Sequence, residues 1–179
     1  IRDISRKLIN LSSAVFGHIK GGIGYVNVMV NTFMAGMSGS SNADAAVIAK
    51  LLVDPMEEKG FKRGLAAGIT ACASLIATVI PPSIALIMYG FMAEVSIGQL
   101  FMAGILPGLL LAFFLFLYNF FIARKHDLPK EHEQFSLKEV LNTLSAAILA
   151  LMTPVIIIGG IRFGIMTPTE AGAITVVYA

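Results

Sequence analysis

The sequence predicts an all-α polytopic membrane protein. Hydrophobic residues make up 56% of its 179 residues, charged residues make up 13%, and the mean hydropathy is +0.82. A soluble domain with this composition has too little polar surface to cover its apolar residues, so we expect a lipid bilayer around the chain. The formal net charge of +2 gives nucleic-acid binding no electrostatic basis, and no nucleic-acid partner is expected.

Residues 1–20 predict an amphipathic helix at the membrane surface. Apolar residues recur at intervals of three and four, and basic residues take positions between them. A helix with this pattern lies in the plane of the membrane interface. The apolar positions are Ile4, Leu8, Leu11, Val15 and Ile19, and the basic ones are Arg2, Arg6, Lys7 and Lys20.

Residues 21–56 predict a re-entrant helical hairpin, which enters and leaves the membrane on one side. Its first apolar piece has about sixteen residues and would be roughly 24 Å long as a helix, which is short of the ~20 residues of a full crossing. A polar break and a second short helix follow. Lys and Arg near membrane segments mark the cytoplasmic side, and a hairpin keeps the flanking basic residues together there. Those residues are Lys20 before the hairpin and Lys59, Lys62 and Arg63 after it.

Residues 60–92 predict a transmembrane helix that is broken by proline. The apolar run stops at Pro81 and Pro82 and resumes at Ile84. Glu94 marks a short turn on the opposite side, and residues 95–123 predict a transmembrane helix that returns. This helix ends in Arg124 and Lys125, so the third basic cluster falls on the side of the first two.

The remainder of the chain predicts a loop and two further helices. Residues 124–135 predict a cytoplasmic loop, and residues 136–165 predict a helix that begins amphipathic, bends and continues as a transmembrane segment. Ser136 and Glu139 have the spacing of a capping box at its start. Residues 167–179 predict the start of the next transmembrane helix. Cys72 lies in an apolar helical pattern and is expected to be a buried thiol.

The polar segment of the hairpin contains residues suited to bind a cation. Glycine permits backbone angles that other residues avoid, and serine and asparagine supply hydroxyl and amide oxygens. Such hard oxygen ligands, together with carbonyls released at a helix break, suit a sodium ion and not a transition metal. The cation-binding candidates here are Ser38, Gly39, Ser40, Ser41 and Asn42.

Two other roles are open for this segment. The half-helix that starts near Ser41 points its N-terminal amides at the hairpin tip, where a substrate carboxylate could bind. Alternatively, Ser41 only caps the helix and Asp44 completes a capping box.

The proline break predicts a second group of oxygen ligands. Pro81 and Pro82 remove two amide donors, so the carbonyls before them lose their helical partners, and a cation could use them. The hydroxyls of Thr78 and Ser83 lie beside the break, although either could bond back to a preceding carbonyl. The cation-binding candidates at the break are Ala77, Thr78, Ile80 and Pro81.

The solute path has four candidates. Asn27 and Asn31 are four residues apart on the entering half-helix and share one side of it, where they line the path or bond across helices. Asp44 and Ser83 complete the set of substrate-path candidates.

Two alternatives to transport are open. Residues 36–39 match the G-x-S-G pattern around the nucleophile of rhomboid-like intramembrane serine proteases, but the predicted membrane segments contain no His to act as base, so no enzyme is expected. A non-transporting membrane scaffold would tolerate changes at the tip except for their effect on stability.

Three stretches resemble the large membrane subunit of tripartite ATP-independent periplasmic (TRAP) transporters. They are residues 31–41 (NTFMAGMSGSS), residues 80–84 (IPPSI) with Tyr89 and Gly90, and residues 167–171 (TPTEA) before residues 176–179 (VVYA). The similarity covers essentially the whole chain in order. It implies a fragment that covers roughly the first of two inverted repeats and contains the first re-entrant hairpin and the broken helix.

The resemblance also implies a function. Large subunits of this family are elevator-type secondary transporters of the bacterial or archaeal cytoplasmic (inner) membrane. They import an organic acid, such as a C4-dicarboxylate or sialic acid, by sodium symport. A periplasmic solute-binding protein delivers the carboxylate substrate, and a small membrane subunit completes the transporter. Sodium is the coupling ion, and no other cofactor is implied. The first sodium site would draw on residues 38–42 and on carbonyls just before Pro81.

Overall fold

The computed structural model describes residues 2–130, 135–167 and 170. The described residues form helices joined by turns, without a strand, which confirms the all-α prediction. The helices are α1 (Arg2–Phe16), α2 (Gly22–Ser38), α3 (Ser41–Glu58), α4 (Arg63–Ser74), a short 3-10 helix (Leu75–Thr78), α5 (Ile84–Met92), α6 (Ile97–Lys125) and α7 (Leu137–Arg162).

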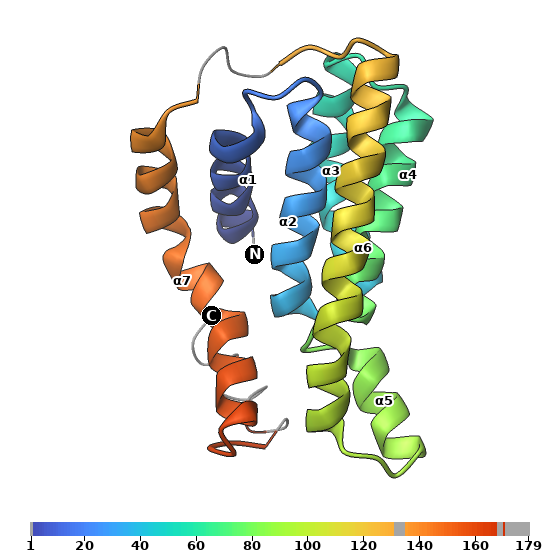
Figure 1. Cartoon of the computed structure of the whole chain (residues 1–179), viewed down its shortest axis with the longest axis vertical. Coiled ribbons are helices and arrows are strands. Elements are labelled where there is room, and N and C mark those ends of the chain that lie inside the picture. The colour runs from blue at the N-terminus through green and yellow to red at the C-terminus, as the bar shows by residue number, and fades with distance from the viewer. Residues whose placement is uncertain (1, 131–134, 168–169, 171–179) are drawn as a thin grey trace.

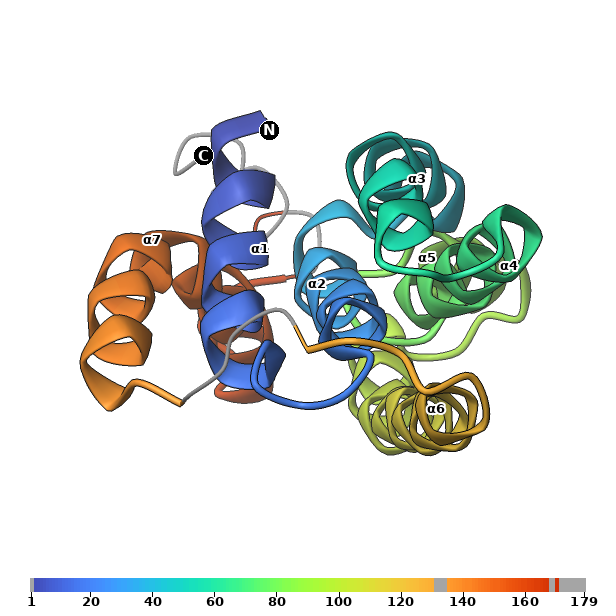
Figure 2. The ribbon, with the colours of Figure 1, turned by 90° about the horizontal axis from the view of Figure 1, so that it is seen from above.

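A bundle of α2, α3, α4 and α6 forms the centre of the molecule. Figure 2 views these four helices nearly end-on, with α2 next to α3 and α6, and α4 next to α3. Their apolar faces share one buried cluster that includes Val28 from α2, Met56 from α3, Ile69 from α4 and Ala112 from α6. Burial of these faces is what holds short helices such as α4 in place.

The first two helices after α1 form an antiparallel hairpin. Figure 1 shows α2 ending near the level where α4 gives way to α5, while α6 continues past this level beside α5, and α3 begins at Ser41, after a turn of two residues. The hairpin therefore stops part of the way along α6.

Helix α1 crosses the bundle instead of joining it. Figure 2 shows α1 along its length where the bundle helices are seen end-on. Its residues Leu8 and Leu11 are buried in a second apolar cluster together with Val30 of α2, Ile48 of α3 and Ala147 of α7. The apolar stripe predicted for residues 1–20 thus packs in part on neighbouring helices.

Three turns that carry basic residues meet at one end of the bundle, as the charge pattern predicted. The α1–α2 turn, the α3–α4 turn and the loop after α6 meet at the top of Figure 1. The Gly21 amide donates to the Pro129 carbonyl at 3.0 Å, and Lys20 forms an ion pair with Asp127. Leu128 is buried beneath this junction.

Two of the described helices, α6 and α7, are long and apolar enough to cross a membrane. Ser136 caps α7 by accepting the Glu139 amide at 3.4 Å, as expected from their spacing. Figure 1 shows a bend in the middle of α7, and Pro154 lies inside this helix. A proline in a helix removes one hydrogen bond and displaces the preceding turn, which accounts for a bend.

The outcomes for Cys72 and for residues 167–179 differ from the other helix predictions. Cys72 is exposed, so the prediction of a buried thiol is wrong; on α4 the side chains of Ile69 and Ala73 face the bundle and Cys72 faces away from it. Most of the helix predicted over residues 167–179 lies outside the described residues. Within them, the Thr167 hydroxyl donates to Glu170 Oε2 at 2.9 Å, and the Glu170 amide donates to the Thr167 hydroxyl at 3.3 Å.

Candidate functional site at the hairpin tip

The hairpin turns through two residues between α2 and α3. Gly39 adopts the left-handed conformation with φ +62°, and Ser40 is extended with φ −130°. The Ser40 hydroxyl accepts the Ala43 amide at 3.4 Å, and the Ser40 amide donates to the Ser38 hydroxyl at 3.3 Å. Ser40 is therefore the N-cap of α3. The expectation that Ser41 caps this helix is wrong, because Ser41 is already its first helical residue.

The broken helix satisfies more of its own polar groups than the sequence suggested. The Thr78 hydroxyl donates to the Leu75 carbonyl at 2.7 Å, which is the back-bond considered above as an alternative. Ser83 caps α5 by accepting the Leu86 amide at 3.3 Å, and its hydroxyl donates to the Thr78 carbonyl at 2.7 Å. The Thr78 carbonyl, expected to lack a partner, thus has one inside the break.

The two interrupted segments meet. The Ile84 amide at the start of α5 donates to the Gly39 carbonyl at 3.2 Å. On its other side, Gly39 lies so close to the Pro82 carbonyl that no Cβ would fit at this position. The structure therefore brings residues 38–40 of the hairpin against residues 82–84 of the broken helix.

Helix α6 packs against the break through two glycines. Gly104 lies directly against the Val79 carbonyl, and Gly108 lies against the side chain of Ile80. A side chain at either position would collide with the break. Sequence analysis missed these two glycines; their separation by four residues on an apolar helix is the typical signal of close helix contact and could have identified them.

Asp44 is buried one turn into α3. Its side chain belongs to a residue that is only 1% exposed, and neither carboxylate oxygen has a hydrogen-bond partner among the described residues. The Ser38 hydroxyl lies beside this carboxylate. Asp44 therefore does not complete a capping box. Asn42, the remaining tip candidate, is exposed.

The two asparagines of the predicted solute path lie away from the tip. Both are buried on α2, and Asn27 donates to the Thr70 hydroxyl of α4 at 2.7 Å. Asn31 donates to the Asn27 side-chain oxygen at 2.9 Å. The Asn27–Thr70 bond corresponds to the cross-helix alternative, whereas the Asn31–Asn27 bond lies within α2. Of the four substrate-path candidates, only Asp44 and Ser83 lie at the tip or the break.

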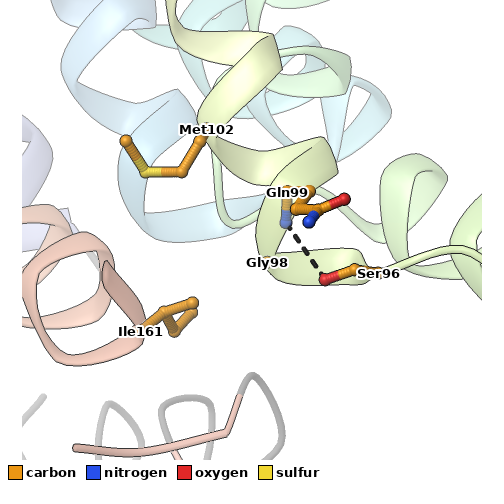
Figure 3. Close-up of a pocket in the computed structure, with 5 residues that line it drawn as sticks. All are labelled: Ser96, Gly98, Gln99, Met102 and Ile161. Carbon is orange, nitrogen blue, oxygen red and sulfur yellow. Dashed lines mark hydrogen bonds between the residues drawn. The ribbon is translucent and has the colours of Figure 1, made fainter. Parts of the chain in front are cut away.

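A pocket of about 380 Å³ opens at the end of the molecule opposite the α1–α2 and α3–α4 turns. Figure 3 shows it between the first turns of α6 and the end of α7. The Ser96 hydroxyl at its rim accepts the Gln99 amide at 3.4 Å, which is the cap of α6. Its lining consists of Ser96, Gly98, Gln99, Met102 and Ile161. None of these residues is charged, and none is a candidate for the cation site or the solute path.

The protease alternative lacks a base near its serine. His18 lies before α2 and Ser38 ends it, so the 17 residues of this helix, about 25 Å, separate them. His126 follows α6 at the same end of the bundle as His18. No histidine among the described residues is therefore in reach of Ser38.

Comparison with known proteins finds a single family along nearly the whole chain. The family model for the DctM component of tripartite ATP-independent periplasmic transporters matches residues 2–179. The sialic acid TRAP transporter large permease protein of Vibrio cholerae is 41% identical over 179 residues. The 2,3-diketo-L-gulonate TRAP transporter large permease protein of Escherichia coli is 42% identical over 176 residues. The C4-dicarboxylate TRAP transporter large permease protein of Pseudomonas aeruginosa is 38% identical over 176 residues.

Each of these three alignments includes 98% of this chain and 41% of the relative. The chain thus spans about two fifths of the length of these permeases. Their names describe transporter subunits and not enzymes.

Proposed function

Because the chain belongs to the family of the DctM component of tripartite ATP-independent periplasmic transporters, we propose that it forms part of a sodium-coupled importer of an organic acid. The observation that carries this proposal is the contact of the Gly39 carbonyl with the start of α5, which joins two helix breaks in one site. Secondary transporters build their ion and substrate sites from such discontinuous helices.

The tip and the break together supply oxygen ligands for a sodium ion. Ser38 and Ser40 use their hydroxyl oxygens as acceptors within the turn, and each oxygen keeps a second lone pair. The carbonyl dipoles at the end of α2 add a negative partial charge at the same place. We propose that the ion lies between residues 38–42 and residues 77–81.

The same place suits the carboxylate of a substrate. Helices α3 and α5 both begin at the contact between tip and break, so two helix N-termini direct amides and positive dipole ends toward it. A sodium ion nearby would add to this attraction. The relatives are named for sialic acid, diketogulonate and C4-dicarboxylates, and we propose an acid of this class as the substrate.

The helix arrangement is compatible with a re-entrant hairpin in a cytoplasmic membrane of a bacterium or archaeon. Helices α6 and α7 are long enough to cross, whereas α2 and α3 end part of the way along α6. The basic end of the bundle is then cytoplasmic, and α1 lies near that interface. We further propose elevator-type movement, delivery by a periplasmic solute-binding protein and assembly with a small membrane subunit.

Reconstitution of the complete transporter tests the coupling. Proteoliposomes that contain the full-length large subunit and its small subunit, with the binding protein outside, should take up the acid when sodium is higher outside. Replacing external sodium by potassium should remove uptake. Uptake that is indifferent to the sodium gradient would contradict the proposal.

Substitutions at the tip test the place of the site. Ser40→Leu and Ser41→Leu should abolish uptake while the protein still inserts into the membrane, because a large apolar side chain excludes both ion and carboxylate. The exposed Glu58→Leu, at the other end of α3, is the control and should retain uptake. Normal uptake by both tip variants would favour the scaffold alternative.

A further inference from the structure

Asp44 is a buried acidic side chain that has no basic partner among the described residues. It is 1% exposed, and both oxygens lack hydrogen bonds among the described residues. Three other carboxylates of the described chain, all nearer the surface, have basic partners: Asp54 and Glu57 bind Arg63, and Asp127 binds Lys20. An ionised carboxylate buried without a partner is strongly disfavoured, so Asp44 requires either a proton or a positive charge beside it, and the oxygen-rich tip is a place where a cation can supply that charge.

Helix capping does not account for Asp44. Ser40 already accepts the Ala43 amide as the N-cap, and the Asp44 amide donates to the Ser40 carbonyl at 3.0 Å as part of the first turn. The neighbouring side chains of Asn42 and Ala43 are exposed, whereas Asp44 faces inward with Ile48 one turn later. Its carboxylate thus points into the protein beside Ser38, on the tip itself.

We propose that the carboxylate of Asp44 provides the negative charge that balances a monovalent cation bound at the hairpin tip. The inference rests on the proposed sodium site and adds to it the charged group that the serines and carbonyls, all neutral, do not supply. In a low-dielectric interior one carboxylate and one monovalent cation form a neutral pair, and each removes the cost of burying the other. A single carboxylate leaves a divalent cation with excess charge, so the site should prefer sodium to calcium.

Sodium-dependent stability of the purified complete transporter tests this role. Unfolding temperature is measured against sodium chloride, with N-methylglucamine chloride keeping the ionic strength constant. The wild-type protein should be stabilised by sodium, because a ligand that binds only the folded state raises its stability. Asp44→Asn should weaken the apparent sodium affinity by about 10–100-fold, the usual effect of removing a supporting group from a metal site. Without sodium its unfolding temperature should be equal to or above that of the wild type.

Asp54→Asn is the matched control. Asp54 lies on the same helix and receives the same substitution, but it is exposed and paired with Arg63 at the other end of α3. It should keep the sodium response. If Asp44→Asn does not accumulate, Asp44→Ser removes the same charge with a smaller side chain and repeats the measurement.

The outcomes separate this inference from the proposed function. A variant without the Asp44 charge whose sodium midpoint stays within about twofold of the wild type overturns the role of Asp44 and leaves the transporter proposal intact. A wild-type protein that responds to sodium neither in stability nor in uptake overturns sodium coupling itself. Calcium stabilisation as strong as that by sodium, lost together with the Asp44 charge, would overturn the monovalent preference.

Discussion

At the scale of single residues, Gly39 is held by two independent constraints. Its φ of +62° is unfavourable for residues with a Cβ, and the Pro82 carbonyl occupies the space where a Cβ would lie. Gly164 shares only the first constraint: its φ is +67°, and among the described residues no atom beyond its chain neighbours lies within 4 Å of the place a Cβ would take. Substitutions at Gly39 and Gly164 therefore distinguish the effect of backbone strain from the effect of the contact between tip and break.

Gly39→Ala should abolish uptake, whereas Gly164→Ala should retain it. Both substitutions force alanine into the left-handed conformation at a cost of roughly 1–2 kcal/mol, but only the first also pushes the tip away from the break. Uptake by proteoliposomes and the unfolding temperature of the purified transporter check this. Equal losses of uptake in the two variants would mean that strain alone, and not the contact, matters.

The Lys20–Asp127 ion pair makes a pH-dependent contact at the basic end. The hydrogen bond and charge of Lys20 hold the pKa of the exposed Asp127 below its ordinary value of 3.8. A carboxyl with a lowered pKa in the folded state contributes stability above its ordinary pKa and loses it as pH falls through the lowered one.

Asp127→Asn should therefore lower the unfolding temperature slightly at about pH 6, and the difference from the wild type should shrink as pH falls below about 4. Asparagine tolerates the positive φ of 46° at this position, so the backbone is unaffected. A difference that is the same at both pH values would show that the pair contributes nothing through its charge.

At the scale of elements, the position of the break depends on its packing against two glycines of α6. Gly104 meets a backbone carbonyl, that of Val79, and Gly108 meets a side chain, that of Ile80. A side chain can move to another rotamer at moderate cost, whereas a carbonyl fixed within the break cannot yield without moving the break itself.

Gly104→Ala should therefore be more destabilising than Gly108→Ala. We expect a loss of about 1–3 kcal/mol for the first, typical of overpacking, and a smaller loss for the second. Thermal unfolding of the two variants shows which substitution is the more destabilising. In Gly104→Ala, the sodium concentration needed for half-maximal uptake should also change. The reverse order would mean that α6 contacts the break mainly through Ile80.

At the scale of the whole molecule, three chain turns that are far apart in sequence form one basic end. Lys59 and Lys125 are exposed there, and Glu94 is exposed in the turn between α5 and α6 at the opposite end. A bundle that crosses a membrane along its long axis would place these two ends on different sides.

Single-cysteine labelling checks this sidedness. In a background with the exposed Cys72 replaced by Ser, Lys59→Cys and Lys125→Cys should react with an impermeant maleimide only from the cytoplasmic side, and Glu94→Cys only from the periplasmic side. The same background without an introduced cysteine is the control. Labelling of Lys59→Cys and Lys125→Cys from different sides would exclude a crossing by the broken helix that α6 reverses.

Some details of the site could not be obtained from local sequence. Ser40 and Ser41 are equivalent as caps by residue type, and only the extended backbone of Ser40 decides between them. The Thr78 carbonyl has lost its helical partner, as predicted, but Ser83, five residues on, folds back to bind it. The exposure of Cys72 depends on which side of α4 meets the bundle, and the small residues Ala71, Cys72 and Ala73 do not by themselves encode that side.

By itself, the sequence determined the all-helical class, the two interrupted segments, the cap at Ser136 and the gathering of basic residues. These follow from composition, from glycine and proline and from charge, which act locally or over the whole chain. The tertiary structure alone decided that Gly39 meets Pro82 and Ile84, that two glycines of α6 support the break and that Asp44 is buried without a partner among the described residues. The reason is physical: contacts between residues far apart in the chain depend on how several helices pack at once, and no local propensity carries that information.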